Sequence, residues 1–278
     1  MELKHGTAIS SDPHRAMMFV GRQKSGKSLA AASFSEAGAT FCYDLDNRIR
    51  SVLTQYPNID YIQLENGRGF AEMDEFIEKQ IKMDKAKRLQ YETLWYASLS
   101  STETALLLDA IKFLGEARAS SGGKGYQIGN IKMTDVQHYG YVSMATMQLW
   151  ENGLINLIKN RYFIFEAHIC TKFDAKGDAV GRMILTTDKN SERLPGRFDE
   201  IYEFIKEPSS ISGGQPRYFV CFESDIASTA FPNLKTDKNR KIDITGKSFY
   251  KEWRRLIEPD LKKVEQNDTR NLEMVKKA

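Results

Sequence analysis

Eight consecutive residues, Gly21 to Ser28, have the types and the spacing of a phosphate-binding loop. They read Gly-Arg-Gln-Lys-Ser-Gly-Lys-Ser and fit the pattern Gly-x-x-x-x-Gly-Lys-Ser/Thr at every fixed position. The glycines allow the backbone to curl so that several amide N–H groups point at one anion. Lys27 is expected to reach the β- and γ-phosphates of a nucleotide, and the Ser28 hydroxyl to ligate magnesium. The motif therefore predicts nucleoside triphosphate binding; the alternative is a chance turn of the same composition.

The segments that flank the motif are those that such a loop requires. Residues 16–20 form an apolar run typical of a buried strand, and residues 28–34 are typical of a helix. A helix that begins at the loop adds its positive N-terminal end to the anion site. The predicted nucleotide-binding residues are Gly21, Arg22, Gln23, Lys24, Ser25, Gly26, Lys27, Ser28 and Leu29.

The rest of the chain alternates between strand-like and helix-like segments, which predicts an α/β fold. Strands are indicated at residues 40–46, 59–64, 162–170, 200–205 and 217–222, and helices at residues 73–81, 138–159 and 249–257. The apolar run at 162–170 is nearly continuous, as in the middle of a parallel sheet. Gly213-Gly214 predicts an antiparallel hairpin between the last two strands. We expect a mostly parallel central sheet flanked by helices, with this hairpin at one edge.

Two segments compete for the strand that should carry an aspartate beside the loop, where it would hold a magnesium-bound water. Residues 105–108 are apolar and precede Asp109, but Ala and Leu prefer helices and the run continues at helical spacing. Residues 93–99 have strand-forming side chains and would put Ala97 where the acid belongs. Residue types favour 93–99, and Asp109 is the candidate metal ligand of the other alternative.

The composition of the chain limits which partners and which cellular compartment we expect. The chain of 278 residues has a net charge of +3, so a nucleic-acid partner has to be met by a local basic patch. Cys42, Cys170 and Cys221 lie in apolar runs, which is typical of reduced core thiols and indicates the cytoplasm. No N-terminal segment is typical of a signal peptide, and no apolar run is long enough to span a membrane.

Two stretches are expected to be loops, and the end of the chain to be a tail. Glycines and serines mark residues 120–126 as a flexible loop, and residues 171–193 are polar. No linker composition divides the chain, so we expect one domain over residues 1–258. Residues 259–278 are highly charged, which predicts a loose helix or a disordered tail.

Several further motifs occur in an order that is typical of one family. They are the loop at 21–28, the Tyr139-Gly140 pair opening a helix, Phe165-Glu166-Ala167-His168 ending a strand, Phe198-Asp199, and the basic turn from Lys235 to Lys241. In these motifs the chain resembles phage-encoded RecA-like ATPases, and more narrowly the Sak-type core-only recombinases and related phage nucleotide-binding proteins. The resemblance covers roughly residues 15–258. It implies a RecA-like P-loop NTPase fold, ATP and magnesium as cofactors, and ATPase activity.

The family's strand at the magnesium site usually reads Tyr-x-Thr, three apolar residues, Asp-Ser. Residues 91–98 match it except that Ala97 replaces the aspartate, which favours the strand at 93–99 and argues against efficient hydrolysis. If Asp109 is the acid instead, the family pattern is intact but the preceding connection is longer than most.

The resemblance also implies roles for residues at strand ends. His168 would sense the γ-phosphate and Glu166 would orient a water. Asp46, from the acidic pair Asp44 and Asp46, would position magnesium or the attacking water. The candidate catalytic residues are thus Lys27, Asp46, Glu166 and His168, and Glu65 is a weaker candidate for the general base. The ordinary alternatives are a hydrogen-bonded core histidine and acids that begin a turn.

By the same resemblance, two basic loops would bind single-stranded DNA. Their residues are Lys124, Tyr126 and Lys132 in the first loop, and Lys172, Lys176 and Arg182 in the second. Basic side chains would contact phosphates and the tyrosine would stack on a base. In a third basic segment, Lys235, Lys238 and Arg240 would reach the γ-phosphate of a neighbouring subunit. Solvated loops and an exposed basic turn are the alternatives.

The expected function is that of an ATP-dependent recombination protein. The chain would form a homo-oligomeric ring or filament on single-stranded DNA in the host-cell cytoplasm and promote annealing or strand exchange. A phage annealing protein or single-stranded-DNA-binding protein would be a further partner. One alternative is a nucleotide-binding assembly or regulatory protein with little turnover, consistent with Ala97. Another is a small-molecule P-loop kinase, which the lack of an arginine-rich lid segment disfavours.

Overall fold

The computed structural model of the chain describes residues 14–63, 70–86, 90–120, 127–128, 131–132, 136–157, 161–174, 176–209 and 214–277. Its strands are β1 (Ala16–Gly21), β2 (Thr40–Asp44), β3 (Ile59–Gln63), β4 (Thr93–Ala97), β5 (Gln127–Ile128), β6 (Ile131–Lys132), β7 (Tyr162–Phe173), β8 (Ala179–Ile184), β9 (Glu200–Glu207), β10 (Arg217–Cys221) and β11 (Lys241–Asp243). Its α-helices are α1 (Lys27–Ala32), α2 (Arg50–Leu53), α3 (Phe70–Lys85), α4 (Leu99–Ser120), α5 (Val136–Gln148), α6 (Asp188–Arg193) and α7 (Phe249–Lys277). Shorter helical turns are η1 (Ser33–Glu36), η2 (Leu149–Gly153), η3 (Leu154–Leu157), η4 (Pro195–Arg197) and η5 (Pro232–Lys235).

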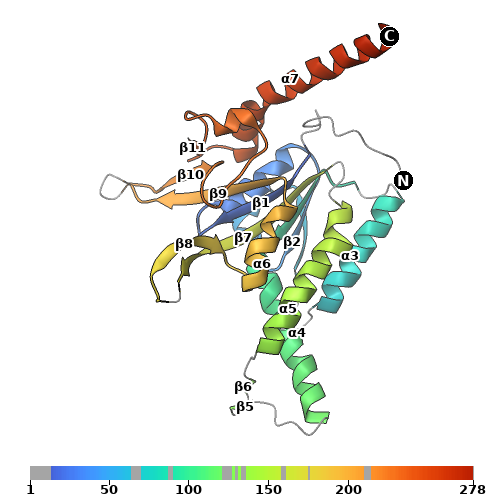
Figure 1. Ribbon diagram of the computed structural model, residues 1–278, viewed down its shortest axis with the longest axis vertical. Helices are drawn as coiled ribbons and strands as arrows, with labels where there is room; N and C mark the ends of the chain where they lie inside the picture. The colour runs from blue at the N-terminus through green and yellow to red at the C-terminus, as the bar shows by residue number, and fades with distance from the viewer. Residues whose placement is uncertain are drawn as a thin grey trace.

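A mostly parallel sheet forms the centre of this α/β structure (Figure 1). Its strands follow the order β11-β10-β9-β1-β7-β4-β2-β3, and β8 pairs with β7 beyond that path. The strands from β9 to β3 run parallel, whereas β10 and β11 add an antiparallel edge. β1 lies between β7 and β9, so that Met17 pairs with both Ile164 and Glu200. The expected parallel sheet and antiparallel hairpin are confirmed.

Helices cover both faces of the sheet, because successive side chains of a strand point to opposite faces. α1, α2 and α7 pack on the face that carries Phe19, Trp95 and Ile164. α3, α4 and α5 pack on the face that carries Val20 and Tyr96, and Figure 1 shows them together on one side of the strands. Burial of both faces explains why the inner strands read as nearly continuous apolar runs.

The strand that competes with the segment before Asp109 is the one that forms. β4 pairs in parallel with β2 and with β7, which places it inside the sheet. Asp109 instead lies within α4, between the buried residues Leu106 and Ala110. The alternative in which Asp109 ends a strand is therefore wrong, because the Ala- and Leu-rich run follows its helix propensity.

Two other segments differ from expectation. Residues 171–193, expected to be a polar loop, contain the end of β7, the antiparallel strand β8 and α6. The short helix expected at residues 249–257 continues as α7 through Pro259 to Lys277, so the tail has the helical one of its two expected forms. Asp260 and Leu261 are buried, so the helix still packs against the body of the protein beyond the proline.

The predicted core thiols differ in their burial. Cys42 is buried, and Cys170 and Cys221 are half-buried. No helix among the described residues combines the length and the apolar character that a membrane crossing requires.

Candidate functional site

The loop between β1 and α1 is curled by three residues with positive φ. Gly21 has φ of 154°, Lys24 of 58° and Gly26 of 97°. A Cβ atom on Gly21 would lie 2.4 Å from the carbonyl oxygen of Phe204 on the neighbouring β9, so no larger side chain fits there. The second glycine is close to an aromatic ring, since its Cβ would lie 3.3 Å from Cδ1 of Tyr218. The loop at 21–28 thus has a backbone shape that depends on its glycines.

Lys27 is held beneath this loop at the start of α1. Its side chain is buried, and Nζ donates to the carbonyl oxygens of Gly21 and Arg22 at 3.0 Å each. Burial lowers the pKa of Lys27, while the charges of Glu166 and then Asp46 raise it. A cation with nearby carboxylates therefore lies directly at the curled backbone.

Glu166 on β7 connects the loop to the sheet. Its Oε2 accepts a 3.0 Å hydrogen bond from the Ser28 hydroxyl, and its Oε1 accepts a 2.8 Å hydrogen bond from Trp95 Nε1 on β4. The carboxyl is buried, and burial raises its pKa to about 7 although the charge of Lys27 acts in the opposite direction. Two donors from separate elements fix the orientation of this carboxyl.

The two acids after β2 have different positions. The Asp44 carboxylate is buried and accepts hydrogen bonds from the backbone N–H groups of Arg48 and Ile49, at 3.0 and 2.9 Å, so it stabilises the turn. Asp46 instead lines the cavity at the loop, and its Oδ1 accepts hydrogen bonds from the hydroxyls of Ser98 and Ser101. Of this pair, only Asp46 is placed to meet a ligand.

His168 lies two residues after Glu166 and beside Lys27. Its Nδ1 is 3.4 Å from Lys27 Nζ and 3.4 Å from the carbonyl oxygen of Gly21. Burial, and then the charge of Lys27, lower the pKa of His168. This lowering favours the neutral imidazole, and His168 lines both the cavity at the loop and a second cavity of about 320 Å³.

The cavity at the loop has a volume of about 610 Å³, which is in the range of small-molecule sites. Residues Lys24 to Ala30 form one wall, and Asp46, Arg48, Ser51 and Val52 lie on a second. A third wall comes from β9 and the antiparallel edge of the sheet and holds Lys206, Gln215, Pro216, Tyr218 and residues 244–247. Sequence reasoning missed this wall; Lys206 near the end of β9 was the available signal, because ligands bind at the carboxyl ends of parallel strands.

Of the two candidate metal ligands, Ser28 lies at the loop and Asp109 does not. Ser28 lines the cavity beside Glu166 and Asp46. Asp109 is absent from the described lining of the cavity, and its charge raises the pKa of Tyr141 on α5, after the effect of burial. Within the described ranges no three His, Cys, Asp or Glu side chains form a metal-binding group. Assigning magnesium to Asp109 is therefore incompatible with its position.

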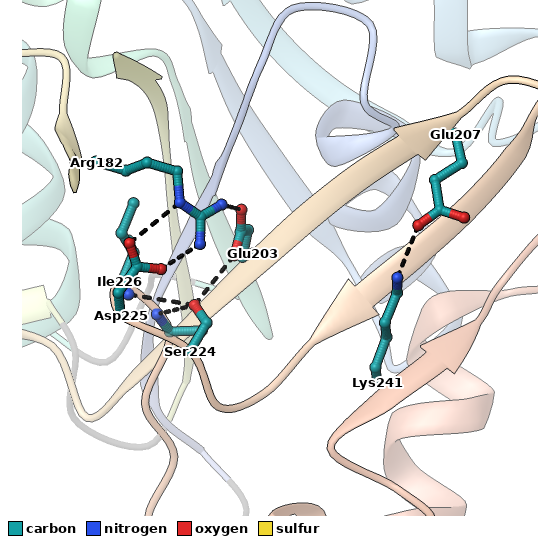
Figure 2. A network of polar contacts seen from close by, with 8 residues as sticks. Arg182, Glu203, Glu207, Ser224, Asp225, Ile226 and Lys241 are labelled. Carbon is teal, nitrogen blue, oxygen red and sulfur yellow. Dashed lines mark hydrogen bonds and ion pairs between the residues drawn. The ribbon is translucent and has the colours of Figure 1, made fainter. Parts of the chain in front are cut away.

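Arg182, expected to contact DNA, is bound to acids of its own chain. Figure 2 shows its guanidinium between Glu203 on β9 and Asp225, with ion pairs to both carboxylates. Ser224 donates to Glu203 at 3.0 Å from the same side. Lys172 and Lys176, in contrast, are exposed on the hairpin that joins β7 to β8.

The remaining predicted residues lie apart from the loop or outside the described residues. Lys235, Lys238 and Arg240 are exposed in and after η5, and none belongs to the described lining of the cavity. Lys132 belongs to β6, which pairs with β5 in a separate two-stranded sheet. Lys124, Tyr126 and Glu65 are outside the described residues.

Comparison with known proteins adds no family to this description. No protein-family model matches the chain, and a search of curated proteins finds no match. The function is therefore inferred from the side chains around the loop.

Proposed function

We propose that this chain is an ATP-binding, RecA-like P-loop ATPase that acts as a homo-oligomer on single-stranded DNA in recombination or annealing. The observation that carries the proposal is the curled loop at 21–28, with Lys27 buried beneath it, at one wall of a cavity of about 610 Å³. The loop follows a central strand and leads into a helix, the arrangement in which backbone N–H groups bind phosphates.

The position of the loop in the sheet supports a nucleotide site. After β1 the chain builds the sheet on one side through β2, and later crosses to the other side with β9. Ligands of open α/β sheets bind at such a reversal of strand order, outside the carboxyl ends of the strands. Lys27 and the curled loop lie at that point.

Each residue at the loop would have a separate role in phosphoryl transfer. Lys27 would neutralise phosphate charge, and the Ser28 hydroxyl with nearby carboxylate oxygens provides the ligand type that magnesium prefers. When bound, magnesium would stabilise charge on the phosphates. Asp46, whose carboxylate accepts hydrogen bonds from Ser98 and Ser101, would orient the attacking water. His168 lies beside Lys27, where it would sense the terminal phosphate.

DNA binding and oligomer formation are proposed from the family resemblance and from exposed residues of the β7–β8 hairpin. They follow from the family resemblance, together with the exposed Lys172 and Lys176 beside Phe173, which is 61% exposed. Lysines and an aromatic ring exposed on one hairpin suit a single strand, whose phosphates and bases they would contact.

The test is ATP binding and hydrolysis with and without single-stranded DNA. We expect the natural protein to bind a fluorescent ATP analogue and DNA to raise phosphate release, whereas Lys27→Ala loses binding. Lys82→Ala on α3 is the matched control, because that lysine is exposed and outside the described cavity lining. Failure of the natural protein to bind ATP would contradict the nucleotide assignment; binding without any DNA response would remove the recombination part.

One observation favours a second candidate, a nucleotide-binding assembly or regulatory protein with weak turnover. β4 ends at Ala97, so the strand contributes no acid at the place where hydrolysis normally needs one. In that case the protein binds ATP tightly, releases little phosphate, and changes its oligomeric state with nucleotide, which sedimentation would measure.

A further inference from the structure

We propose that the acid of the magnesium site has moved from β4 to the adjacent strand β7, so that Glu166 supplies the carboxylate that supports magnesium beside Ser28. This inference rests on the proposed nucleotide binding and specifies how that site is completed. Ala97 has a role as well, because its small side chain leaves the site to the glutamate.

The register of the sheet places Ala97 and Glu166 side by side. β4 and β7 are parallel, and their pairing runs from Thr93 with Tyr162 to Tyr96 with Phe165. Extending this register by one residue sets Ala97 opposite Glu166. Adjacent strands are about 4.8 Å apart, so an acidic side chain at either position reaches the same small region at the carboxyl end of the sheet.

The two side chains also point to the same face of the sheet. Trp95 and Ala97 belong to the apolar cluster that includes α1, and the Trp95 indole donates to Glu166. A carboxylate at position 97 would therefore lie beside the one at position 166 in a buried site. Two like charges so close in a buried environment disfavour each other, and only one of the two positions carries an acid.

The hydrogen bonds of Glu166 leave one oxygen directed at the loop. Oε1 is held by Trp95, while Oε2 accepts from the Ser28 hydroxyl, the group expected to ligate magnesium. When a cation takes the Ser28 oxygen as a ligand, Oε2 is already adjacent to it. No rearrangement of the sheet is required.

Asp46 is the other acid at the cavity, and its contacts indicate a different role. Its Oδ1 is bound by Ser98 and Ser101, which belong to the segment after β4 and not to the loop. Glu166 is the acid that contacts a residue of the loop, through Ser28, and Asp46 is left to act on water.

The test is the gain in ATP affinity that magnesium produces, measured as the difference between titrations in MgCl₂ and in EDTA. We expect Glu166→Gln to keep its magnesium-free affinity but to lose about 10- to 100-fold of the gain, as for other groups that support a metal ligand. The substitution preserves the size of the side chain; its carbonyl oxygen can still accept from Trp95, while its NH₂ group would donate to the Ser28 hydroxyl. Glu200→Gln is the matched control, because Glu200 is also a buried glutamate on an inner strand but is outside the described cavity lining.

An exchange of the two positions tests the idea directly. We expect the double variant Ala97→Asp with Glu166→Ala to recover the magnesium-dependent gain that Glu166→Ala alone loses. Thermal unfolding establishes that each variant is folded. A folded Glu166→Gln protein that keeps the full gain overturns the inference, and so does a folded exchange variant without the gain. If the natural protein binds no ATP in either buffer, the proposed function fails instead.

Discussion

Arg182 on β8 forms an ion pair with Glu203 on β9, whose side chain is only 2% exposed. The same guanidinium also binds Asp225, which lies in the turn after β10 (Figure 2). These contacts attach the β7–β8 hairpin to a strand that neighbours β1. An arginine that the sequence marks as a candidate DNA contact is therefore placed to support the structure.

Removal of this arginine is expected to destabilise the protein. Arg182→Ala leaves the buried carboxyl of Glu203 with Ser224 as its remaining donor, and an incompletely satisfied buried group costs about 1 to 3 kcal/mol. The control is Lys241→Ala, which breaks the pair with Glu207 also drawn in Figure 2. Because both partners of that pair are exposed, its loss should cost less than about 1 kcal/mol. Urea unfolding compares the two variants, and an equal cost would contradict this view of Arg182.

Lys172 and Lys176 are expected to affect DNA binding without affecting stability. Both side chains are exposed, and each phosphate contact on a single strand contributes about 0.7 to the dependence of log affinity on log salt. The double alanine variant should therefore weaken binding of an oligonucleotide and reduce the salt slope by about 1.4. Replacing the exposed Lys82 and Lys85 of α3 removes the same charge and should leave the slope unchanged. A slope that falls equally in both variants would indicate only a general charge effect.

Gly21→Ala should abolish nucleotide binding through the backbone alone. The added methyl group would lie 2.4 Å from the Phe204 carbonyl oxygen, and φ of 154° is unfavourable for alanine. We expect a loss of stability of about 1 to 3 kcal/mol together with loss of ATP binding. In Gly196→Ala no heavy atom lies within 4 Å of the new Cβ, so this variant should keep both properties. Retention of ATP affinity in Gly21→Ala would show that the loop tolerates another shape.

Because Glu200 is buried, we expect the free energy of unfolding to fall as the pH rises. Burial raises its pKa to about 7, despite hydrogen bonds from Thr229 and the Ala230 N–H group that act against the rise. The folded protein therefore binds a proton more tightly than the unfolded chain does. Stability from this group is fully present below the unfolded pKa near 4.5 and is lost between there and about 7. The slope is at most about 1.4 kcal/mol per pH unit.

Glu200→Gln should remove this contribution, because a glutamine does not titrate. Denaturant unfolding at pH 5 and pH 8 should show a smaller decrease in the variant than in the natural protein. Glu258→Gln is a suitable control, since that exposed glutamate has a pKa lowered by Lys262 and not raised by burial. A decrease of the same size in Glu200→Gln would assign the pH dependence to other groups.

The sequence predicts the inner strands and the loop because burial and backbone shape leave clear patterns there. The apolar runs of β1 and β7 reflect the burial of these strands. The spacing of Gly21, Gly26 and Lys27 reflects the backbone shape of the loop. Residue types favour β4 over the segment before Asp109, since Thr and aromatic side chains favour strands, and the family pattern favours the same segment. In these places local preference and tertiary structure agree.

The errors occur where tertiary contacts decide. β8 is exposed along most of its length, so it lacks the apolar alternation that identifies a strand. Residue types leave a helical and a disordered tail as alternatives, and burial of Asp260 and Leu261 accompanies the helical form. The pairing of Ser28 with Glu166 is likewise unreadable from the sequence, because it arises from the register of β1 with β7.

The central place of β1 has a consequence for how the protein is made. Ala16 pairs with Phe163 and Met17 with Glu200, so both neighbours of the first strand come from much later in the chain. Contacts between such distant segments form slowly, and on a ribosome the first strand is synthesised well before either neighbour exists. The loop at residue 21 would therefore acquire its shape only after β7 and β9 have emerged. ATP could then stabilise the chain only late in its synthesis, and a fragment that stops before β7 should not bind it.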